Sequence, residues 1–242
     1  MNEKETLREM IKNAERIVFF GGAGVSTASG IPDFRGSAGL YTEDVGAERP
    51  EEILHTRYLS RYPERFYAYY RSHMLYPYAE PNGAHYALSQ LEREGRLSAV
   101  VTQNIDGLHT AAGSRTVHEL HGSVLRNFCV ACGRKYPLSF ILDSEGVPTC
   151  PACGAIVRPD VVLYGEGLDG AVFDAAIRAI SEADLLLVGG SSLTVQPAAS
   201  LIEYYDGEEL VILNKTPTPY DGVATLLIRD PIEEVLSEIV AE

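Results

Sequence analysis

The four cysteines of the chain form two pairs, Cys129 with Cys132 and Cys150 with Cys153, and 17 residues separate the pairs. Two knuckles at this spacing can bring four thiolates around one zinc ion in a tetrahedral site. Two disulfides are the alternative, but they are rare inside cells and the chain shows no secretory signal. We therefore predict a zinc site. Four cysteines leave no coordination position for water, so the predicted role of the zinc is structural.

A second candidate site is the segment GGAGVSTASGIPDFRG at residues 21–36, which follows the apolar run IVFF. A turn that follows a buried strand and exposes backbone amides can bind a phosphate. The segment does not fit the dinucleotide fingerprint, because Thr27 stands where a glycine is required, and it lacks the Gly-Lys-Ser/Thr of a P-loop. Gly22 and Gly24 still permit close backbone approach, although such a turn can also be a simple tight connection. Directly after it, Arg35 could pair with a pyrophosphate and Phe34 could cover a ring.

Polar residues also follow other predicted strands. They are TQNID at 102–106, GGSS at 189–192 and Asn214 after VIL, with HELHG at 118–122 between the first two. An open parallel sheet binds its ligands at the carboxyl ends of its strands. Each segment alone could be an ordinary turn, because Asn, Asp, Ser and Gly are common turn residues. Together they supply amide and hydroxyl groups suited to a ribose and a carboxamide.

Alternating helices and strands must position these groups. Apolar spacing predicts helices at 3–15, 170–181, 197–205 and 231–240, and another through residue 94 after an N-cap at Asn82. Strands are predicted at 17–20, 97–102, 184–188 and 210–213, a further strand-like run starts at 161, and a short helix is expected to begin at Val25. This alternation predicts an α/β fold with a Rossmann-like parallel sheet and helices on both faces. Two insertions interrupt it, a helical one at 37–80, with a helix near 64–74, and the zinc module, and together they form a small domain.

Composition limits the classes of function. Apolar residues make up 45% of the chain and charged residues 22%, which is typical of a globular protein. The net charge of −14 disfavours nucleic acid as a specific partner, although an acidic surface can serve solubility alone. No apolar run approaches the roughly 20 residues that span a bilayer, so no membrane association is expected. We expect a monomer in the cytoplasm.

The motifs together resemble those of sirtuins, the NAD-dependent protein-lysine deacylases. GAGVSTASGIPDFRG, TQNIDGLH, the HG pair at 121 and 122, the two cysteine pairs, RPDVVLYGE and GSS occur in the family's order and span nearly the whole chain. The chain looks closest to bacterial members of minimal length. The resemblance implies an NAD-binding domain of residues 1–36, 81–121 and 165–242, a helical insertion at 37–80 and a zinc-binding module at 122–164.

The resemblance also implies a set of site residues. His121 would be the general base, and Asn104 would act beside it. Phe34 and Arg35 would lie on a loop that closes over NAD. The remaining NAD contacts would be Gly22, Ala23, Gly24, Thr27, Gln103, Asn104, Ile105, Asp106, Gly190, Ser191, Ser192, Asn214 and Lys215.

The implied reaction removes an acyl group from lysine. The acyl oxygen attacks C1′ of the nicotinamide ribose and expels nicotinamide, which forms an alkylimidate. A neutral imidazole then takes a proton from a ribose hydroxyl that attacks the imidate carbon, and the products are lysine and O-acyl-ADP-ribose. Histidine suits this step because its unperturbed pKa of about 6.5 leaves it largely neutral at pH 7. The sequence leaves the roles of His109 and His118 open.

The protein substrate would bind as an added strand. By resemblance, the contacting residues are Val161, Val162, Leu163, Tyr164, Gly165, Glu166 and Val195. Backbone pairing of this kind reads little sequence, so a broad range of acylated-lysine proteins is expected. Val161 and Val162 should line the lysine channel, although both could equally be residues of a buried strand.

Acyl preference depends on one position. Family members that remove acidic acyl groups carry a Tyr-x-x-Arg pair in the helical insertion. When the family pattern is aligned on Phe66-Tyr67 and on Pro81-Asn82, Tyr70 stands at the position of that arginine. Arg71 is one residue later, which turns its side chain about 100° around a helix. We therefore predict a deacetylase that prefers neutral acyl groups. Alternatives are a desuccinylase or demalonylase, a protein mono-ADP-ribosyltransferase and, least favoured, a non-enzymatic NAD-sensing module.

Overall fold

The larger of two sheets has six parallel strands. The computed structural model describes residues 2–33 and 48–241. The strands are β1 (Ile17–Gly21), β2 (Leu97–Thr102), β3 (Val117–Glu119), β7 (Leu185–Gly189), β8 (Glu209–Leu213) and β9 (Leu226–Ile228). Their spatial order is β3-β2-β1-β7-β8-β9, and each neighbouring pair is parallel. Numbered along the chain, this is the order 3-2-1-4-5-6 of doubly wound nucleotide-binding sheets, in which the ligand lies where the order reverses. Here that point is between β1 and β7.

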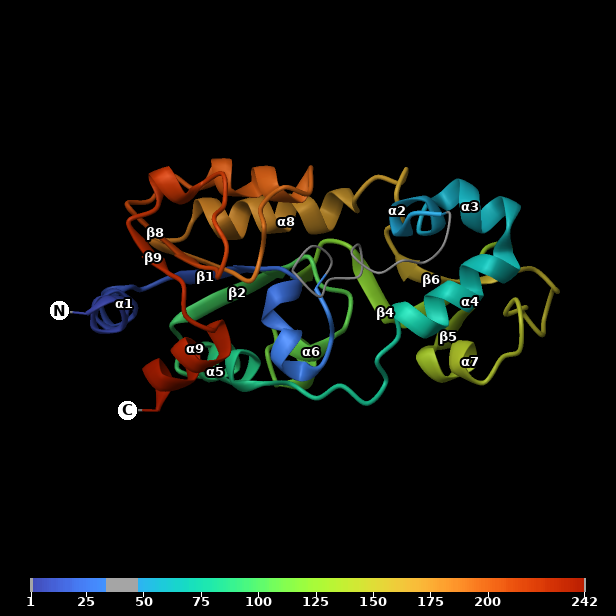
Figure 1. Cartoon of the computed structure of the whole chain (residues 1–242), viewed down its shortest axis with the longest axis horizontal. Helices are drawn as coiled ribbons and strands as arrows, with labels where there is room; N and C mark the ends of the chain where they lie inside the picture. The colour runs from blue at the N-terminus through green and yellow to red at the C-terminus, as the bar shows by residue number, and fades with distance from the viewer. Residues whose placement is uncertain (1, 34–47, 242) are drawn as a thin grey trace.

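Helices cover both faces of this sheet. Helices α1 (Glu3–Asn13), α5 (Gly83–Arg93) and α9 (Ile232–Val240) pack on one face, and α8 (Gly170–Ser181) and the 3-10 helix η4 (Ala198–Tyr204) pack on the other (Figure 1). The run IVFF serves both cores, because Ile17 and Phe19 lie in one and Val18 and Phe20 lie in the other. A strand buried on both faces is apolar throughout, as β1 is. The predicted fold class is confirmed.

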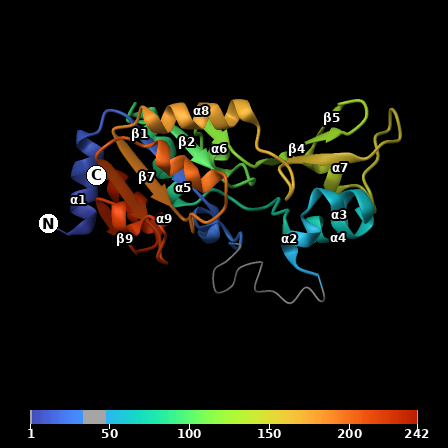
Figure 2. The same cartoon turned by 90° about the horizontal axis from the view of Figure 1, so that it is seen from above.

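The smaller sheet is antiparallel and has the order β5-β4-β6. Its strands are β4 (Gly122–Cys129), β5 (Lys135–Pro137) and β6 (Val157–Val161). It shares a third core with α2 (Pro50–Ile53), α3 (Thr56–Arg61), α4 (Pro63–His73) and α7 (Leu138–Leu142). The hydroxyl of Tyr67 on α4 donates to the carbonyl of Val157 on β6 at 2.7 Å, which joins the two segments. Figures 1 and 2 both place this part at the opposite end of the molecule from the two termini.

Local structure differs from the sequence prediction in several places. The short helix expected at Val25 is replaced by two 3-10 turns, η1 (Ala23–Val25) and η2 (Thr27–Ser29), and the predicted helix at 197–205 is the 3-10 helix η4. The run from 161 is mostly not a strand, because β6 ends at Val161 and Tyr164 forms only an isolated bridge to His55. The edge strands β3 and β9 were not predicted, since three residues are too few to show a period. The remaining connections are α6 (Leu108–Ala111) and η5 (Asp221–Val223).

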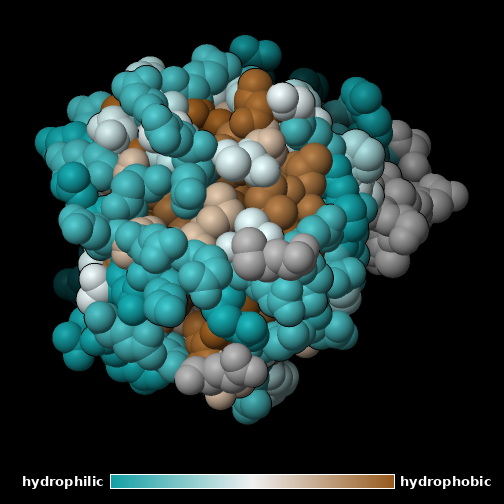
Figure 3. Space-filling model, turned by 90° about the vertical axis from the view of Figure 1, so that its left-hand side faces the viewer, coloured by the Kyte–Doolittle hydropathy of each residue, from teal (hydrophilic) through white to brown (hydrophobic). Residues whose placement is uncertain are grey.

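The end face that carries the termini is mostly hydrophilic, with apolar side chains exposed in a few places (Figure 3). Among the described residues, no helix combines the length and apolarity needed to span a bilayer.

Candidate functional site

A cleft of about 1150 Å³ opens at the carboxyl ends of β1, β2, β7 and β8, and residues of the smaller part form its other wall. Every described residue of the predicted NAD and peptide sets lines this one cleft. Phe34 and Arg35 lie outside the described residues. The cleft residues are Gly22, Ala23, Gly24, Thr27, Gln103, Asn104, Ile105, Asp106, His121, Val161, Val162, Leu163, Tyr164, Gly165, Glu166, Gly190, Ser191, Ser192, Val195, Asn214 and Lys215.

The glycines after β1 and β7 hold two backbone turns together. The amide of Gly22 donates to the carbonyl of Gly189 at 3.1 Å, and that of Gly24 donates to the carbonyl of Gly190 at 2.8 Å. A Cβ on Gly24 would lie 2.8 Å from the Cα of Gly190, which itself has a φ of +59°. Close approach and a left-handed backbone both require glycine here. These turns form the floor of the cleft at the point where the strand order reverses.

Ser26, which the sequence analysis did not select, links the β1 turn to the loop after β2. Its hydroxyl donates to Asp106 Oδ2 at 2.7 Å and accepts from Asn104 Nδ2 at 3.1 Å. Asn104 is buried, and its backbone amide donates to Thr102 Oγ1 at 3.0 Å. Ser26 thus holds the Asn104 side chain, and Thr102 holds its backbone. The signal available in the sequence was the place of Ser26 inside the glycine-rich turn.

Gln103 connects the predicted base to the β7 turn. Its side-chain Nε2 donates to Ser191 Oγ at 3.0 Å, and its backbone carbonyl lies 2.9 Å from His121 Nδ1. A carbonyl can only accept, so Nδ1 carries the proton and Nε2 keeps its lone pair. Burial lowers the pKa of His121, and the hydrogen bond to the Gln103 carbonyl opposes that effect. The imidazole is therefore neutral at pH 7, with Nε2 able to accept a proton.

His109 and His118, whose roles the sequence left open, do not line the cleft. His109 is 2% exposed and lies against His85, with ring centroids 4.7 Å apart. Among the described residues, neither ring nitrogen of His109 has a hydrogen-bond partner. Burial lowers the pKa of His109 to about 3 and that of His85 to about 4. His109 and His85 are therefore both neutral and buried in the interior.

The wall formed by residues 161–166 is held by its own backbone. The amide of Val162 donates to the carbonyl of His121 at 3.0 Å, and the amide of Tyr164 donates to the carbonyl of Leu54 at 3.0 Å. Arg158, which the sequence analysis did not select, forms an ion pair with Glu166. These bonds connect the predicted peptide wall directly to the residue predicted as the base.

The position relevant to acyl preference is occupied by Tyr70. Arg71 turns away from the cleft, and its Nε and Nη2 donate to the Ile141 carbonyl at 3.0 Å and to Ser144 Oγ at 2.9 Å. Tyr70 lines the cleft, and its buried hydroxyl has no partner among the described residues. This wall therefore offers a neutral hydroxyl and no guanidinium from Arg71.

The four cysteines are positioned to bind one zinc ion. Their sulfur atoms all lie within 4.8 Å of one another. The distance from Cys129 Sγ to Cys153 Sγ is 3.4 Å, and that from Cys132 Sγ to Cys150 Sγ is 3.7 Å. A disulfide needs about 2.05 Å, whereas zinc–sulfur bonds of about 2.3 Å place tetrahedral sulfurs near 3.8 Å. The sulfur arrangement fits a closed zinc shell and excludes the alternative of two disulfides.

Known proteins share both the sequence and the fold. A family model described as the Sir2 family matches residues 22–197. An NAD-dependent protein deacetylase of Clostridium perfringens (strain 13 / Type A) is 55% identical over 236 residues, which cover 97% of each chain. A solved Sir2 structure with a p53 peptide and NAD+ has a TM-score of 0.86 at 40% identity, and covers 99% of this chain and 97% of that one.

Another solved Sir2 structure, a variant with a deacetylated p53 peptide and 3′-O-acetyl-ADP-ribose, has a TM-score of 0.91 at 37% identity. The alignment covers 98% of this chain and 97% of that one. Full-length identity, a family match over most of the chain and the shared fold agree with the motifs read from the sequence. The chain belongs to the Sir2 family.

Proposed function

We propose that the chain is an NAD-dependent protein deacetylase that removes acetyl and other neutral acyl groups from lysine side chains. One water molecule is consumed, and the products are nicotinamide, O-acetyl-ADP-ribose and free lysine. The observation that carries this proposal is the hydrogen bond from His121 Nδ1 to the Gln103 carbonyl, which leaves Nε2 as a proton acceptor in the cleft. Relatives named as NAD-dependent protein deacetylases support the same activity.

Each wall of the cleft has a proposed part in the reaction. The glycine turns at 22–24 and 190–192, with Asn214 and Lys215, bind the phosphates and the adenosine. Asn104 and Asp106, fixed through Ser26, orient the nicotinamide ribose and carboxamide so that the acyl oxygen reaches C1′ as nicotinamide leaves. His121 Nε2 then takes the proton from the ribose hydroxyl that attacks the former acyl carbon. Phe34 and Arg35 are proposed to cover the bound cofactor.

The peptide is proposed to bind along residues 161–166 and near Val195 as an extended strand. Support comes from the backbone of this wall, which already bonds to β4 and to the segment before α3. Among the described residues, no hydrogen bond uses the amide or the carbonyl of Gly165 or the carbonyl of Val162. Those groups can pair with an incoming strand, so the main chain supplies affinity with little sequence preference.

The domain division is proposed on the same basis. Residues 1–36, 81–121 and 165–242 would bind NAD, and 37–80 with 122–164 would form the small domain. The separate third core of the smaller part supports this division. The zinc shell lies outside the cleft and contributes to folding, with no part in the chemistry. The monomeric state and the cytoplasmic location stay predictions.

The test is a coupled assay with NAD and acetyl-, propionyl- and succinyl-lysine peptides. Equal amounts of nicotinamide and deacylated peptide are expected with the two neutral peptides, and little with the succinyl peptide because Tyr70, and not the Arg71 guanidinium, lines the cleft. His121→Ala should keep its fold and its NAD binding and lose nearly all turnover. Nicotinamide release that needs no acyl peptide, with ADP-ribose attached to protein, would instead establish a mono-ADP-ribosyltransferase.

A further inference from the structure

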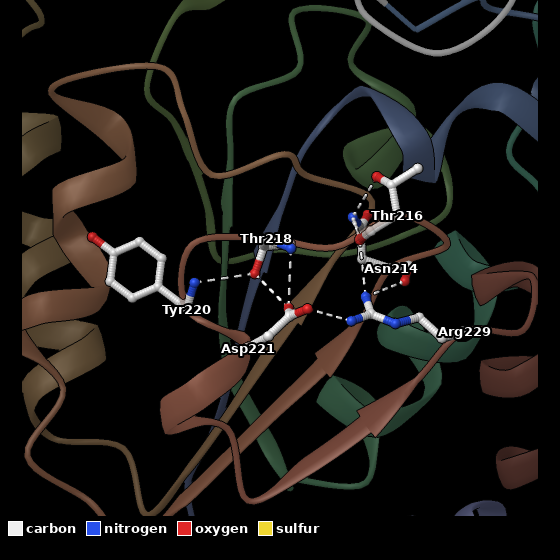
Figure 4. A network of polar contacts seen from close by, with 6 residues as sticks. All are labelled: Asn214, Thr216, Thr218, Tyr220, Asp221 and Arg229. Atoms are coloured by element: carbon white, nitrogen blue, oxygen red, sulfur yellow. Dashed lines mark hydrogen bonds and ion pairs between the residues drawn. The ribbon is translucent and has the colours of Figure 1, made fainter.

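One arginine, which directly follows β9, organises the loop after β8. Arg229 follows β9, and its Nη1 donates to the carbonyls of Asn214 at 2.8 Å and Thr216 at 2.9 Å. Its Nη2 pairs with the carboxylate of Asp221 in η5. Figure 4 shows the guanidinium between Asp221 and the two carbonyls. One side chain thus joins the beginning, the middle and the end of residues 214–221.

Asp221 holds the second half of the loop. Its Oδ1 accepts from the Thr218 amide at 3.1 Å and from Thr218 Oγ1 at 2.7 Å, while Oδ2 faces Arg229 (Figure 4). Thr218 Oγ1 in turn accepts from the Tyr220 amide at 3.3 Å. Both carboxylate oxygens are therefore used, and a change at Asp221 alters the loop as well as the ion pair.

This arrangement fixes the orientation of Asn214. Its Nδ2 donates to the Thr216 carbonyl at 2.8 Å, the same carbonyl that Arg229 contacts. Its backbone amide donates to the Ile228 carbonyl at 3.0 Å. The amide group is held by its nitrogen, so its oxygen Oδ1 is left for a donor such as a ribose hydroxyl. Asn214 and Lys215 both line the cleft.

Global stability does not explain the network. The Arg229 and Asp221 side chains are 37% and 22% exposed, so water screens their ion pair in part and its contribution to folding is modest. All the hydrogen bonds of the Arg229 guanidinium fall within residues 214–221. What the network determines is the shape of the loop that presents Asn214 and Lys215 to the cleft.

We propose that Arg229 and Asp221 are positioning residues for the adenosine half of NAD. They contact no substrate themselves, and they act by holding residues 214–221 in the conformation that directs Asn214 Oδ1 and Lys215 into the cleft. The inference rests on the proposed function, because it assumes that NAD occupies this cleft with its adenosine beyond β8.

The experiment compares Arg229→Ala with Arg229→Lys, Asp221→Asn and a control, Arg16→Ala. Arg16 forms a longer and more exposed ion pair with Glu182, 3.9 Å apart, next to the amino end of β1 and outside the cleft. We expect Arg229→Ala to raise the KM for NAD about tenfold, with kcat, the KM for an acetyl peptide and the Tm close to those of Arg16→Ala. Arg229→Lys should be intermediate, because one ammonium cannot reproduce the planar fork that joins Asp221 to two carbonyls. Asp221→Asn should also be intermediate, since its oxygen still accepts from Thr218.

Fragments of NAD separate positioning from a general effect. AMP probes the adenosine half and nicotinamide mononucleotide probes the other half, each as a competitor and by calorimetry. Arg229→Ala should weaken AMP about as much as NAD and leave nicotinamide mononucleotide unchanged. Equal weakening of both fragments, or an unchanged KM for NAD, overturns the proposal. If the wild-type chain shows no turnover, the proposed function fails, yet weaker AMP binding by Arg229→Ala still supports positioning and unchanged AMP binding still overturns it.

Discussion

Arg158 and Glu166 form a two-point ion pair, with 2.5 Å from Nη1 to Oε1 and 2.9 Å from Nη2 to Oε2. The same Nη2 donates to the Val161 carbonyl at 2.8 Å, and the same Oε2 accepts from the Leu163 amide at 2.9 Å. The pair therefore closes the loop that follows β6 and fixes the wall proposed for the peptide. Its side chains are 15% and 24% exposed, so water screens it only in part.

Glu166→Gln should weaken peptide binding selectively. The substitution keeps the volume but removes the charge that faces Arg158, and the loop loses its fixed shape. We expect a rise of about tenfold in the KM for an acetyl peptide, an unchanged KM for NAD, and a loss of roughly 2 kcal/mol in the free energy of unfolding, below the 3–5 kcal/mol typical of fully buried pairs. Steady-state kinetics measure the two KM values, and denaturant titration measures the free energy of unfolding. The double variant with Arg158→Met should lose less stability than the two single changes added together, and strict additivity would contradict the coupling.

The pH profile of kcat/KM should reflect the environment of His121. Because burial holds the pKa of His121 below its usual 6.5, the base stays neutral and active below that pH. We expect the acid limb of the profile to have its midpoint below pH 6.5, measured with buffers of constant ionic strength. The matched variant is Gln103→Ala, which keeps the backbone carbonyl that orients His121 and should leave this midpoint in place. A midpoint at or above 6.5 would show that the imidazole is not held neutral by burial.

His109→Leu should make the protein less sensitive to acid. The pKa of His109 is about 3 in the folded state and about 6.5 in the unfolded state, so between these values the unfolded chain binds the extra proton. Stability is complete above pH 6.5 and falls as the pH drops, by about 1.4 kcal/mol per pH unit for this site. Thermal melts at pH 7.5 and 5.0 should show a smaller decrease in Tm for the variant than for the wild type. The value at pH 7.5 controls for lost packing, and an equal decrease in both proteins would exclude His109 as a source of acid sensitivity.

Gly190→Ala and Gly146→Ala separate backbone strain from steric clash. Both glycines have a φ of +59°. A Cβ at Gly146 meets nothing within 4 Å, whereas one at Gly190 would lie 2.6 Å from the Gly24 carbonyl carbon. Gly146→Ala should lose about 1 kcal/mol of stability from strain alone. Gly190→Ala should lose more and should also raise the KM for NAD, since the two turns must separate. Similar losses in both variants would mean that the close approach is not essential.

Chelation of zinc should loosen the smaller part first. Cys129 ends β4, Cys132 follows it, and Cys150 and Cys153 precede β6; of these, Cys129 and Cys150 are buried in the third core. Hydrogen exchange after treatment with a strong chelator should show lost protection in β4–β6, while β1, β2 and β7 keep theirs. Cys132→Ser should behave in the same way without chelator. Simultaneous loss of protection in both sheets would show that the two parts unfold as one unit.

Local signals predicted most of this fold and much of its site. The cysteine knuckles, the N-cap at Asn82 and the apolar run of β1 are short patterns whose geometry follows from nearby residues. The predicted and observed bounds of β2 are the same, because a buried apolar run of this length between two helices is long enough to be identified as a strand. Strands β3, β4, β5 and β9 were not predicted, and the shortest of them, β3, β5 and β9, are identified only by their pairing with neighbouring strands.

Residues whose hydrogen-bond partners are distant in the sequence were also not predicted, because their role depends on the folded structure. Ser26 bonds to Asp106, 80 positions away, and Arg229 bonds to Asn214 from the following strand. Nothing in the sequence around a serine or an arginine indicates such a partner. The residues that line the cleft belong to the family's motifs, whereas Ser26 and Arg229, which hold them in place, bond to partners far away in the sequence.

The two 3-10 turns after β1 have a consequence for how the cofactor leaves. In the dinucleotide-binding folds of hydride-transfer enzymes the pyrophosphate sits at the start of a long helix, whose dipole stabilises the bound phosphates. Here η1 and η2 have three residues each, and Gly30 with a φ of +82° follows them. In the proposed reaction the nucleotide is changed and must depart after every turnover. Two short turns offer the phosphates less dipole attraction than a long helix would, which favours release of the product nucleotide.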